Sequence, residues 1–226
     1  MEDTVPRYKS YNYLFKVCLN ICLTSFTFGY GNGNFNSIAF DDIIDIYNLH
    51  QYPRASTQGF LTGSLSIMGG AGAFLSSYLL QKMSRKQSVE FLAWMSLCAG
   101  IILMIPHLGF LIIGRLIQGL CIGMCSTVAP LYLREICPIE IAASLCPYNQ
   151  IFIVFGITSS FTLSFLFSMF LPAHIYWRFV FGFPILVSCL QLYNLKFNYP
   201  YETPKYLVAQ KKFDEAKQLL HVIYHP

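Results

Sequence analysis

Charged residues are scarce in this chain of 226 residues, of which only 12% are Asp, Glu, Lys or Arg while 55% are hydrophobic. Soluble domains carry about twice that share of charge. Disordered chains combine low hydrophobicity with few aromatic residues, whereas 16% of the residues here are aromatic. The composition therefore excludes both an ordinary soluble domain and intrinsic disorder.

The chain also lacks the patterns that other functional classes need. Its five histidines fall in predicted loops or in the tail and match no catalytic or metal-binding set, so we predict no enzyme, metal or cofactor. The net charge of +4 gathers on no basic face, which excludes nucleic acid as a partner. No cleavage pattern of a signal peptide is present, so the first apolar run is expected to be retained.

The eight cysteines show no metal-binding spacing either. Cys18 and Cys22 are four residues apart, as are Cys121 and Cys125, so each pair shares a helical face without matching a paired zinc motif. We expect them to be small buried packing residues.

Apolar sequence without charge is abundant. Runs free of Asp, Glu, Lys and Arg cover residues 17–40, 55–81, 91–114, 116–133, 141–177 and 179–195. A helix that spans a bilayer needs about 20 mainly apolar residues. The sequence therefore predicts an all-α membrane protein, embedded in the lipid bilayer, with six transmembrane helices over residues 17–38, 59–80, 89–106, 110–133, 145–170 and 177–196. The longest predicted outer loop covers residues 39–58.

The basic residues predict the orientation of these helices. If both termini are cytosolic, the outer side holds only Arg54, Arg115 and Arg178 of the 15 Lys and Arg residues. Such an excess of basic residues on one side marks the cytosolic face. We predict a cytosolic amino terminus, a transmembrane domain and a cytosolic tail that begins a helical segment, over residues 1–16, 17–196 and 197–226.

Polar residues in the first apolar run suggest a function, because an amide in hydrocarbon needs a hydrogen-bond partner. Asn32 and Asn36 share one helical face, and Gly29 and Gly33 repeat the same spacing. The glycines allow close helix packing. The amides can bond either a polar solute or a neighbouring helix.

The fourth and fifth runs hold further candidates. Gly119 and Gly123 form a close-packing pair, and Arg115 beside them is expected to anchor at helix-end carbonyls or in the headgroup region rather than face a solute. Asn149 and Gln150 are adjacent and point about 100° apart on a helix, so at most one faces a central cavity. Gln150 suits sugar hydroxyls and an interhelix bond equally well.

In this order the motifs resemble the amino-terminal half of a sugar porter of the major facilitator superfamily, and especially a facilitative glucose transporter. The resemblance rests on Phe28-Gly29-Tyr30 with Gly33 and Asn36, the loop 81–88 with Arg85-Lys86, Gly114-Arg115 leading to Pro130-Leu131-Tyr132 and Glu135, Asn149-Gln150-Ile151, Trp177-Arg178, and Glu202-Thr203-Pro204. Each motif is weak alone, whereas the ordered set covers most of the chain and is specific.

The resemblance implies one half of a major facilitator fold, built of two inverted three-helix repeats, in a protein that transports a hexose-type monosaccharide by alternating access. It implies substrate contacts at Gln150, Asn36 and Phe28. It also implies the plasma membrane, which is the family's commonest location.

The resemblance further implies a cytosolic gate network of Arg85, Glu135 and Glu202 that stabilises the outward-open state. The chain departs from the family pattern near this network at Ser84, Ala142, Tyr201 and Lys205. Lysine cannot make the planar two-point contact of arginine. These departures are expected where a gate is no longer used.

The second six spans of a sugar porter have no counterpart in these 226 residues. Our leading hypothesis is a half-length transporter that works by facilitated diffusion, with a homodimer supplying the second half. A uniporter is expected because the charge-free runs hold no carboxylate for proton coupling. The alternative is a truncated product that does not transport, or one that pairs with a full-length transporter. A gene model that ends early is a third possibility.

Overall fold

The computed structural model describes residues 11–38, 40–47, 49–198 and 202–223. The predicted segment 1–16 therefore lies largely outside the described residues. Six helices are long and apolar enough to cross a membrane, as predicted: α1 (Tyr11–Gly33), α3 (Arg54–Lys82), α4 (Arg85–Leu103), α5 (Leu108–Ile136), α7 (Tyr148–Phe170) and α8 (Ala173–Tyr193). Shorter elements are α2 (Phe40–Tyr47), α6 (Ile139–Leu145), the π-helical turn η1 (Asn194–Asn198), α9 (Pro204–Ala209) and α10 (Phe213–Ile223).

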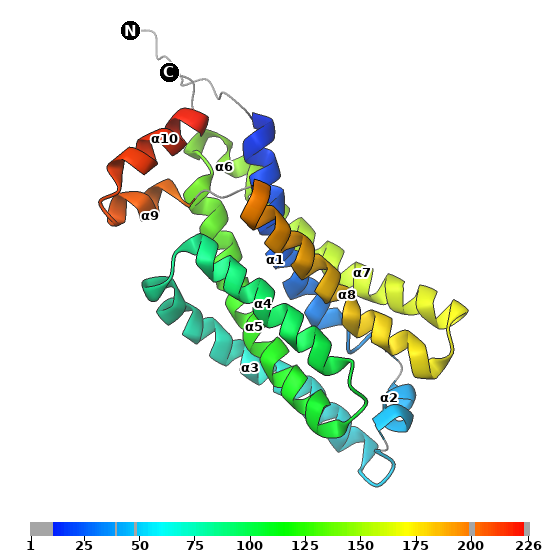
Figure 1. Cartoon of the computed structure of the whole chain (residues 1–226). Coiled ribbons are helices and arrows are strands. Elements are labelled where there is room, and N and C mark those ends of the chain that lie inside the picture. The colour runs from blue at the N-terminus through cyan, green and yellow to red at the C-terminus, as the bar shows by residue number, and fades with distance from the viewer. Residues whose placement is uncertain (1–10, 39, 48, 199–201, 224–226) are drawn as a thin grey trace.

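The six long helices form two groups of three. The first helices of the groups, α1 and α5, pack side by side; α7 packs along α1, α3 packs along α5, and α4 packs against α8 (Figure 1). Each group thus lends its second helix to the first helix of the other group. Because α1 and α5 run in opposite directions, the two groups are inverted copies, as predicted.

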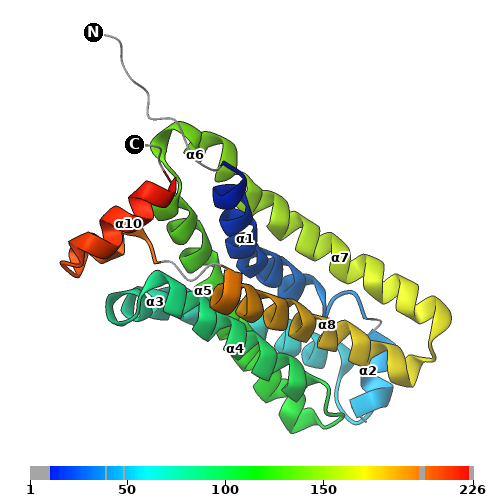
Figure 2. The same cartoon turned by 45° about the horizontal axis from the view of Figure 1, so that its top comes forward.

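The bundle has two distinct ends. The terminal end holds the start of α1 together with α6, α9 and α10, and the distal end holds α2 (Figures 1 and 2). An even number of long helices returns the chain to the side on which it started. The first and last described segments therefore lie at the same end of the bundle.

The distal end contains a helix that the sequence does not predict. The expected loop at 39–58 contains α2, which packs with α8. The Tyr176 hydroxyl donates to Asp42 at 2.6 Å, and the Tyr47 hydroxyl donates to the Leu103 carbonyl at 3.3 Å. Burial raises the pKa of Tyr47. These contacts join α2 to the distal ends of α8 and α4.

The connection between α3 and α4 is short because Ser84 caps α4. The Ser84 hydroxyl accepts from the Gln87 amide nitrogen at 3.1 Å, and the Gln87 side chain accepts from the Ser84 amide nitrogen at 3.2 Å. This capping box satisfies helix-start donors that have no partner within the helix. It places the start of α4 directly beside the end of α3.

Glycines bring α1 and α7 into backbone contact. A side chain at Gly29 would overlap the Ile153 carbonyl, and one at Gly33 would overlap the Ser160 hydroxyl. From the other helix, Gly156 faces the Phe26 carbonyl in the same way. Small residues on both helices thus allow this close approach.

The second group repeats this arrangement between α5 and α3. A side chain at Gly119 would overlap the Leu65 carbonyl region, and one at Gly123 would overlap the Gly69 carbonyl. Gly72 of α3 faces the Leu120 carbonyl of α5 in return. The two close-packed helix pairs are therefore equivalent under the inverted repeat.

Candidate functional site

The two adjacent amides at the start of α7 have different partners. The Asn149 side-chain oxygen accepts from the Ser25 hydroxyl of α1 at 2.5 Å. Gln150 is exposed and makes no hydrogen bond within the described part of the chain. Successive helical residues point about 100° apart, so one amide can join two helices while the other stays open. Of the two, Gln150 is the group available to a ligand.

The predicted substrate contacts of the first span lie at and beyond the end of α1. Phe28 is half-buried against the apolar cluster of the terminal end, while Asn36 is exposed and follows the last residue of the helix. Asn36 donates to the Asn32 carbonyl at 3.4 Å, and Asn32 donates to the Phe28 carbonyl at 2.9 Å. Neither amide joins two helices in the described residues.

The packing register shows how far apart these residues lie along the bundle. Ser25 faces Asn149 and Gly33 faces Ile157, so α1 and α7 run parallel with a constant offset. Phe28 lies within one helical turn of the level of Gln150, whereas Asn36 lies ten residues further towards the distal end, about 15 Å along the axis. The three residues therefore do not form one contact cluster.

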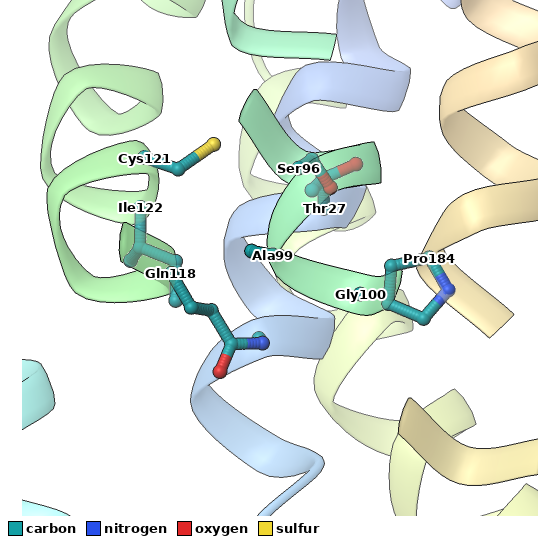
Figure 3. A pocket seen from close by; sticks show the side chains of 9 residues that line it. Thr27, Ser96, Ala99, Gly100, Gln118, Cys121, Ile122 and Pro184 are labelled. Carbon is teal, nitrogen blue, oxygen red and sulfur yellow. The ribbon is translucent and has the colours of Figure 1, made fainter. Parts of the chain in front are cut away.

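A small cavity lies between α1, α4, α5 and α8 rather than along α7 (Figure 3). Its volume is about 10 Å³, which is enough for one water molecule but not for a sugar. Its polar lining comes from Thr27, Ser96 and Gln118. None of the predicted substrate contacts lines it, so this cavity is a packing feature of the helix group.

Polar side chains continue from this cavity towards the terminal end. The Gln191 side chain of α8 donates to the Thr24 hydroxyl at 2.7 Å and to the Asn20 carbonyl at 3.2 Å. The sequence analysis did not select these residues, although polar residues in apolar runs were the available signal. They join α8 to α1 by hydrogen bonds inside the helix group.

Arg115 lies in the protein interior, contrary to its predicted place at a helix end or in the headgroup region. Its side chain is only 1% exposed. It donates to the Gln118 side chain at 3.0 Å and to the Leu61 carbonyl at 3.5 Å, and its guanidinium lies 4.5 Å from the centre of the Phe35 ring. The interaction with the ring and these acceptors replaces part of the hydration that the charge loses on burial.

A bidentate ion pair joins α4 to α5 at the terminal end. Arg85 donates to both carboxylate oxygens of Glu135, at 2.9 and 3.1 Å, and to the Leu80 carbonyl at 3.1 Å. The Thr203 hydroxyl donates to Glu135 at 3.2 Å. The Glu135 side chain is 5% exposed, so the pair is well shielded from solvent.

Glu202, the third predicted member of the network, contacts the start of α4 instead of Arg85. It accepts from the Ser84 hydroxyl at 2.5 Å and from the Lys86 backbone nitrogen at 3.3 Å. A carboxylate at a helix start is stabilised by the free backbone donors there. Ser84, which replaces the family glycine, thus adds a contact, while Lys205 reaches Glu135 only at 4.0 Å.

The sequence matches a family model. Residues 17–224 match the model described as "Sugar (and other) transporter". The chain is 30% identical to the glucose transporter GlcP of Staphylococcus epidermidis over 76% of its own length and 37% of the relative. It is 30% identical to plastidic glucose transporter 4 of Arabidopsis thaliana over 92% of its own length and 36% of the relative.

Solved structures show the same architecture. The xylose transporter XylE from E. coli, in a partially occluded inward-open conformation, superposes with a TM-score of 0.84 at 22% identity, over 92% of this chain and 55% of that one. The described helices thus form half of a major facilitator fold, and the chain spans less than half the length of the curated relatives given above. Because the family model matches nearly the whole sequence, the chain belongs to the sugar transporter family of the major facilitator superfamily.

Proposed function

We propose that this chain forms one half of a path for a hexose-type sugar and that Gln150 binds the sugar. The proposal is carried by the contrast at the start of α7, where Asn149 is bonded to Ser25 and Gln150 is exposed and unpaired. An amide both donates and accepts, which matches sugar hydroxyls. Phe28 lies near the same level and supplies an apolar surface for a sugar ring, while Asn36 contacts a different part of the path.

The open face of the helix group supports the need for a second half. Of the apolar part of each helix, 72% is buried for α1 but only 28% for α3 and 17% for α7. Major facilitator halves are related by an axis along the membrane normal, so a second copy in parallel orientation can supply the missing face. A full-length transporter is the alternative partner.

We infer that transport is by facilitated diffusion through alternating access. Glu90 and Glu135, the carboxylates of the six described spans, both lie near the terminal end and away from Gln150. No carboxylate of these spans is thus placed beside the sugar path to carry a proton. The ion pair of Arg85 with Glu135, and Glu202 on the start of α4, form the contacts that stabilise the outward-open state.

We further infer that the terminal end is cytosolic and that the plasma membrane is the host. Lys82, Arg85, Lys86 and Arg134 lie at this end, whereas Arg54 and Arg178 lie at the distal end. The bias matches the excess of basic residues on cytosolic faces. Protease protection of tags fused to each terminus, in sealed cells, tests the orientation: both tags must stay protected.

Uptake by liposomes that contain only the purified chain tests transport directly. Saturable uptake of D-glucose, but not of L-glucose, is expected, and a pH gradient should leave its initial rate unchanged. Stimulation by the gradient would instead indicate proton coupling, as in the proton:xylose symporter XylE. Absence of uptake from correctly inserted protein would support a truncated product without transport, or a partner of a full-length transporter.

A further inference from the structure

Two cysteines from distant parts of the sequence touch at the terminal end. The sulfur atoms of Cys18, in α1, and Cys137, directly after α5, lie 3.4 Å apart. Both side chains are buried, with 2% and 7% exposure. A small movement is enough to bring sulfur atoms at contact distance to bonding distance, so this pair is positioned for a disulfide.

A third thiol connects this pair to the surface. Cys146, which ends α6, is partly exposed and hydrogen-bonds to Cys137. The hydrogen bond from Cys18 lowers the pKa of the Cys137 thiol, which lies outside the spanning segments. A lowered pKa raises the fraction of thiolate, the form that attacks other sulfur atoms.

We propose that Cys146, Cys137 and Cys18 form a thiol relay that a hydroperoxide oxidises to a Cys18–Cys137 disulfide. This modification is separate from sugar binding, since none of the three thiols belongs to the predicted path. It also differs from a lone reactive cysteine, because an exposed thiol and two buried partners lie in contact.

The relay consists of three balanced steps. The Cys146 thiolate attacks hydrogen peroxide: the O–O bond breaks, an S–O bond forms, and hydroxide leaves and takes up a proton as water. The Cys137 thiolate attacks the Cys146 sulfenic sulfur, forms a disulfide and releases the oxygen as a second water. Cys18, as thiolate, attacks the Cys137 sulfur, forms the final disulfide and releases the Cys146 thiolate. Two thiols are oxidised and one peroxide is reduced to two waters.

The final bond would connect the two inverted repeats. It joins α1, the first helix of one repeat, to the end of α5, the first helix of the other. Cys137 lies two residues after Glu135, so the crosslink also restrains the helix end that pairs with Arg85. Reduction by a cellular thiol such as glutathione reverses the bond.

Peptide mass spectrometry of the full chain tests the relay. The purified chain in detergent is treated with hydrogen peroxide, its free thiols are blocked with N-ethylmaleimide under denaturing conditions, and cross-linked peptides are sequenced. We expect Cys18 joined to Cys137 and a blocked Cys146. Finding Cys18 and Cys137 both blocked, at a peroxide dose that oxidises Cys146, overturns the proposal. A Cys137–Cys146 disulfide as the only product overturns the last step.

Two variants and one internal control make the test specific. Cys146→Ser should slow crosslinking by about tenfold because the exposed thiol is lost, whereas Cys98→Ser, which removes an exposed cysteine elsewhere, should not change it. Equal rates in both variants would exclude Cys146 from the relay. Cys121 and Cys125 lie 3.9 Å apart on one helix and should stay reduced, which excludes unspecific oxidation. Size-exclusion elution before oxidation verifies that each variant is folded.

Discussion

The Tyr30 hydroxyl of α1 donates to the main-chain carbonyl of Val180 in α8 at 2.9 Å. Pro184 lies four residues after Val180 and has no backbone N–H, so the helix itself supplies no donor to this carbonyl. Neighbouring helices must satisfy such freed groups where water is absent. Tyr30 therefore compensates for a proline in another helix and joins the two.

Replacing Tyr30 with Phe should reveal the cost of that unpaired carbonyl. We expect a loss of about 1–2 kcal/mol in the free energy of unfolding in detergent. In a Pro184→Ala background the helix supplies its own donor, so the same replacement should cost clearly less. Equal losses in both backgrounds, measured by thermal unfolding, would show that Tyr30 does not compensate for Pro184.

Glycine contacts between α3 and α5 predict a sharp difference between two alanine variants. A methyl group at Gly123 would overlap the Gly69 carbonyl, which is backbone and cannot move aside, whereas Gly70 has nothing within 4 Å. We expect Gly123→Ala to cost at least 1–3 kcal/mol and Gly70→Ala to be neutral or to stabilise by up to about 1 kcal/mol. Thermal unfolding of both variants decides; similar midpoints would contradict close packing here.

The ion pair of Arg85 with Glu135 should contribute much more than an exposed pair. Glu135→Gln leaves a shielded guanidinium without its charge partner and should cost about 3 kcal/mol. The matched change Asp41→Asn breaks the exposed pair with Arg54 and should cost less than about 1 kcal/mol. The same unfolding measurement compares them, and equal costs would mean that shielding does not strengthen the pair.

Ser84 should stabilise the start of α4 even though the family has glycine at this position. Ser84→Gly removes the hydroxyl that caps α4 and contacts Glu202, so we expect a loss of about 1 kcal/mol. Ser84→Thr keeps the hydroxyl and should retain most of the stability. If both variants unfold together with the parent chain, the hydroxyl contributes nothing and this departure from the family is neutral.

The overall fold could be predicted from sequence because bilayer thickness fixes helix length, and six long charge-free runs meet that length. The ends of the helices were harder to place. The first span was expected to reach residue 38, but α1 ends at Gly33, because Phe35 and Ile38 are apolar for a different reason: they pack in the distal core after the helix has ended. The helix α2 was missed because a short segment with three aspartates resembles a loop.

The candidate site was harder to predict because side-chain partners come from distant parts of the sequence. Gln150 and Asn149 looked alike in the sequence, and only the position of Ser25 across the helix contact separates their roles. Arg115 was expected near the headgroups, but Phe35 and the Leu61 carbonyl hold it inside. Residue types indicated which groups need partners, while the packing decided which partners they have.

Uptake of D-glucose by liposomes that contain either Gln150→Ala or Gln58→Ala tests the sugar path most directly. Both changes remove an exposed amide, one at the start of α7 and the other near the start of α3. We expect Gln150→Ala to lower kcat/KM at least tenfold, because a hydrogen-bonded sugar hydroxyl loses its partner, and Gln58→Ala to behave like the parent chain. Saturable uptake that is equal in the parent chain and both variants would contradict a sugar contact at Gln150.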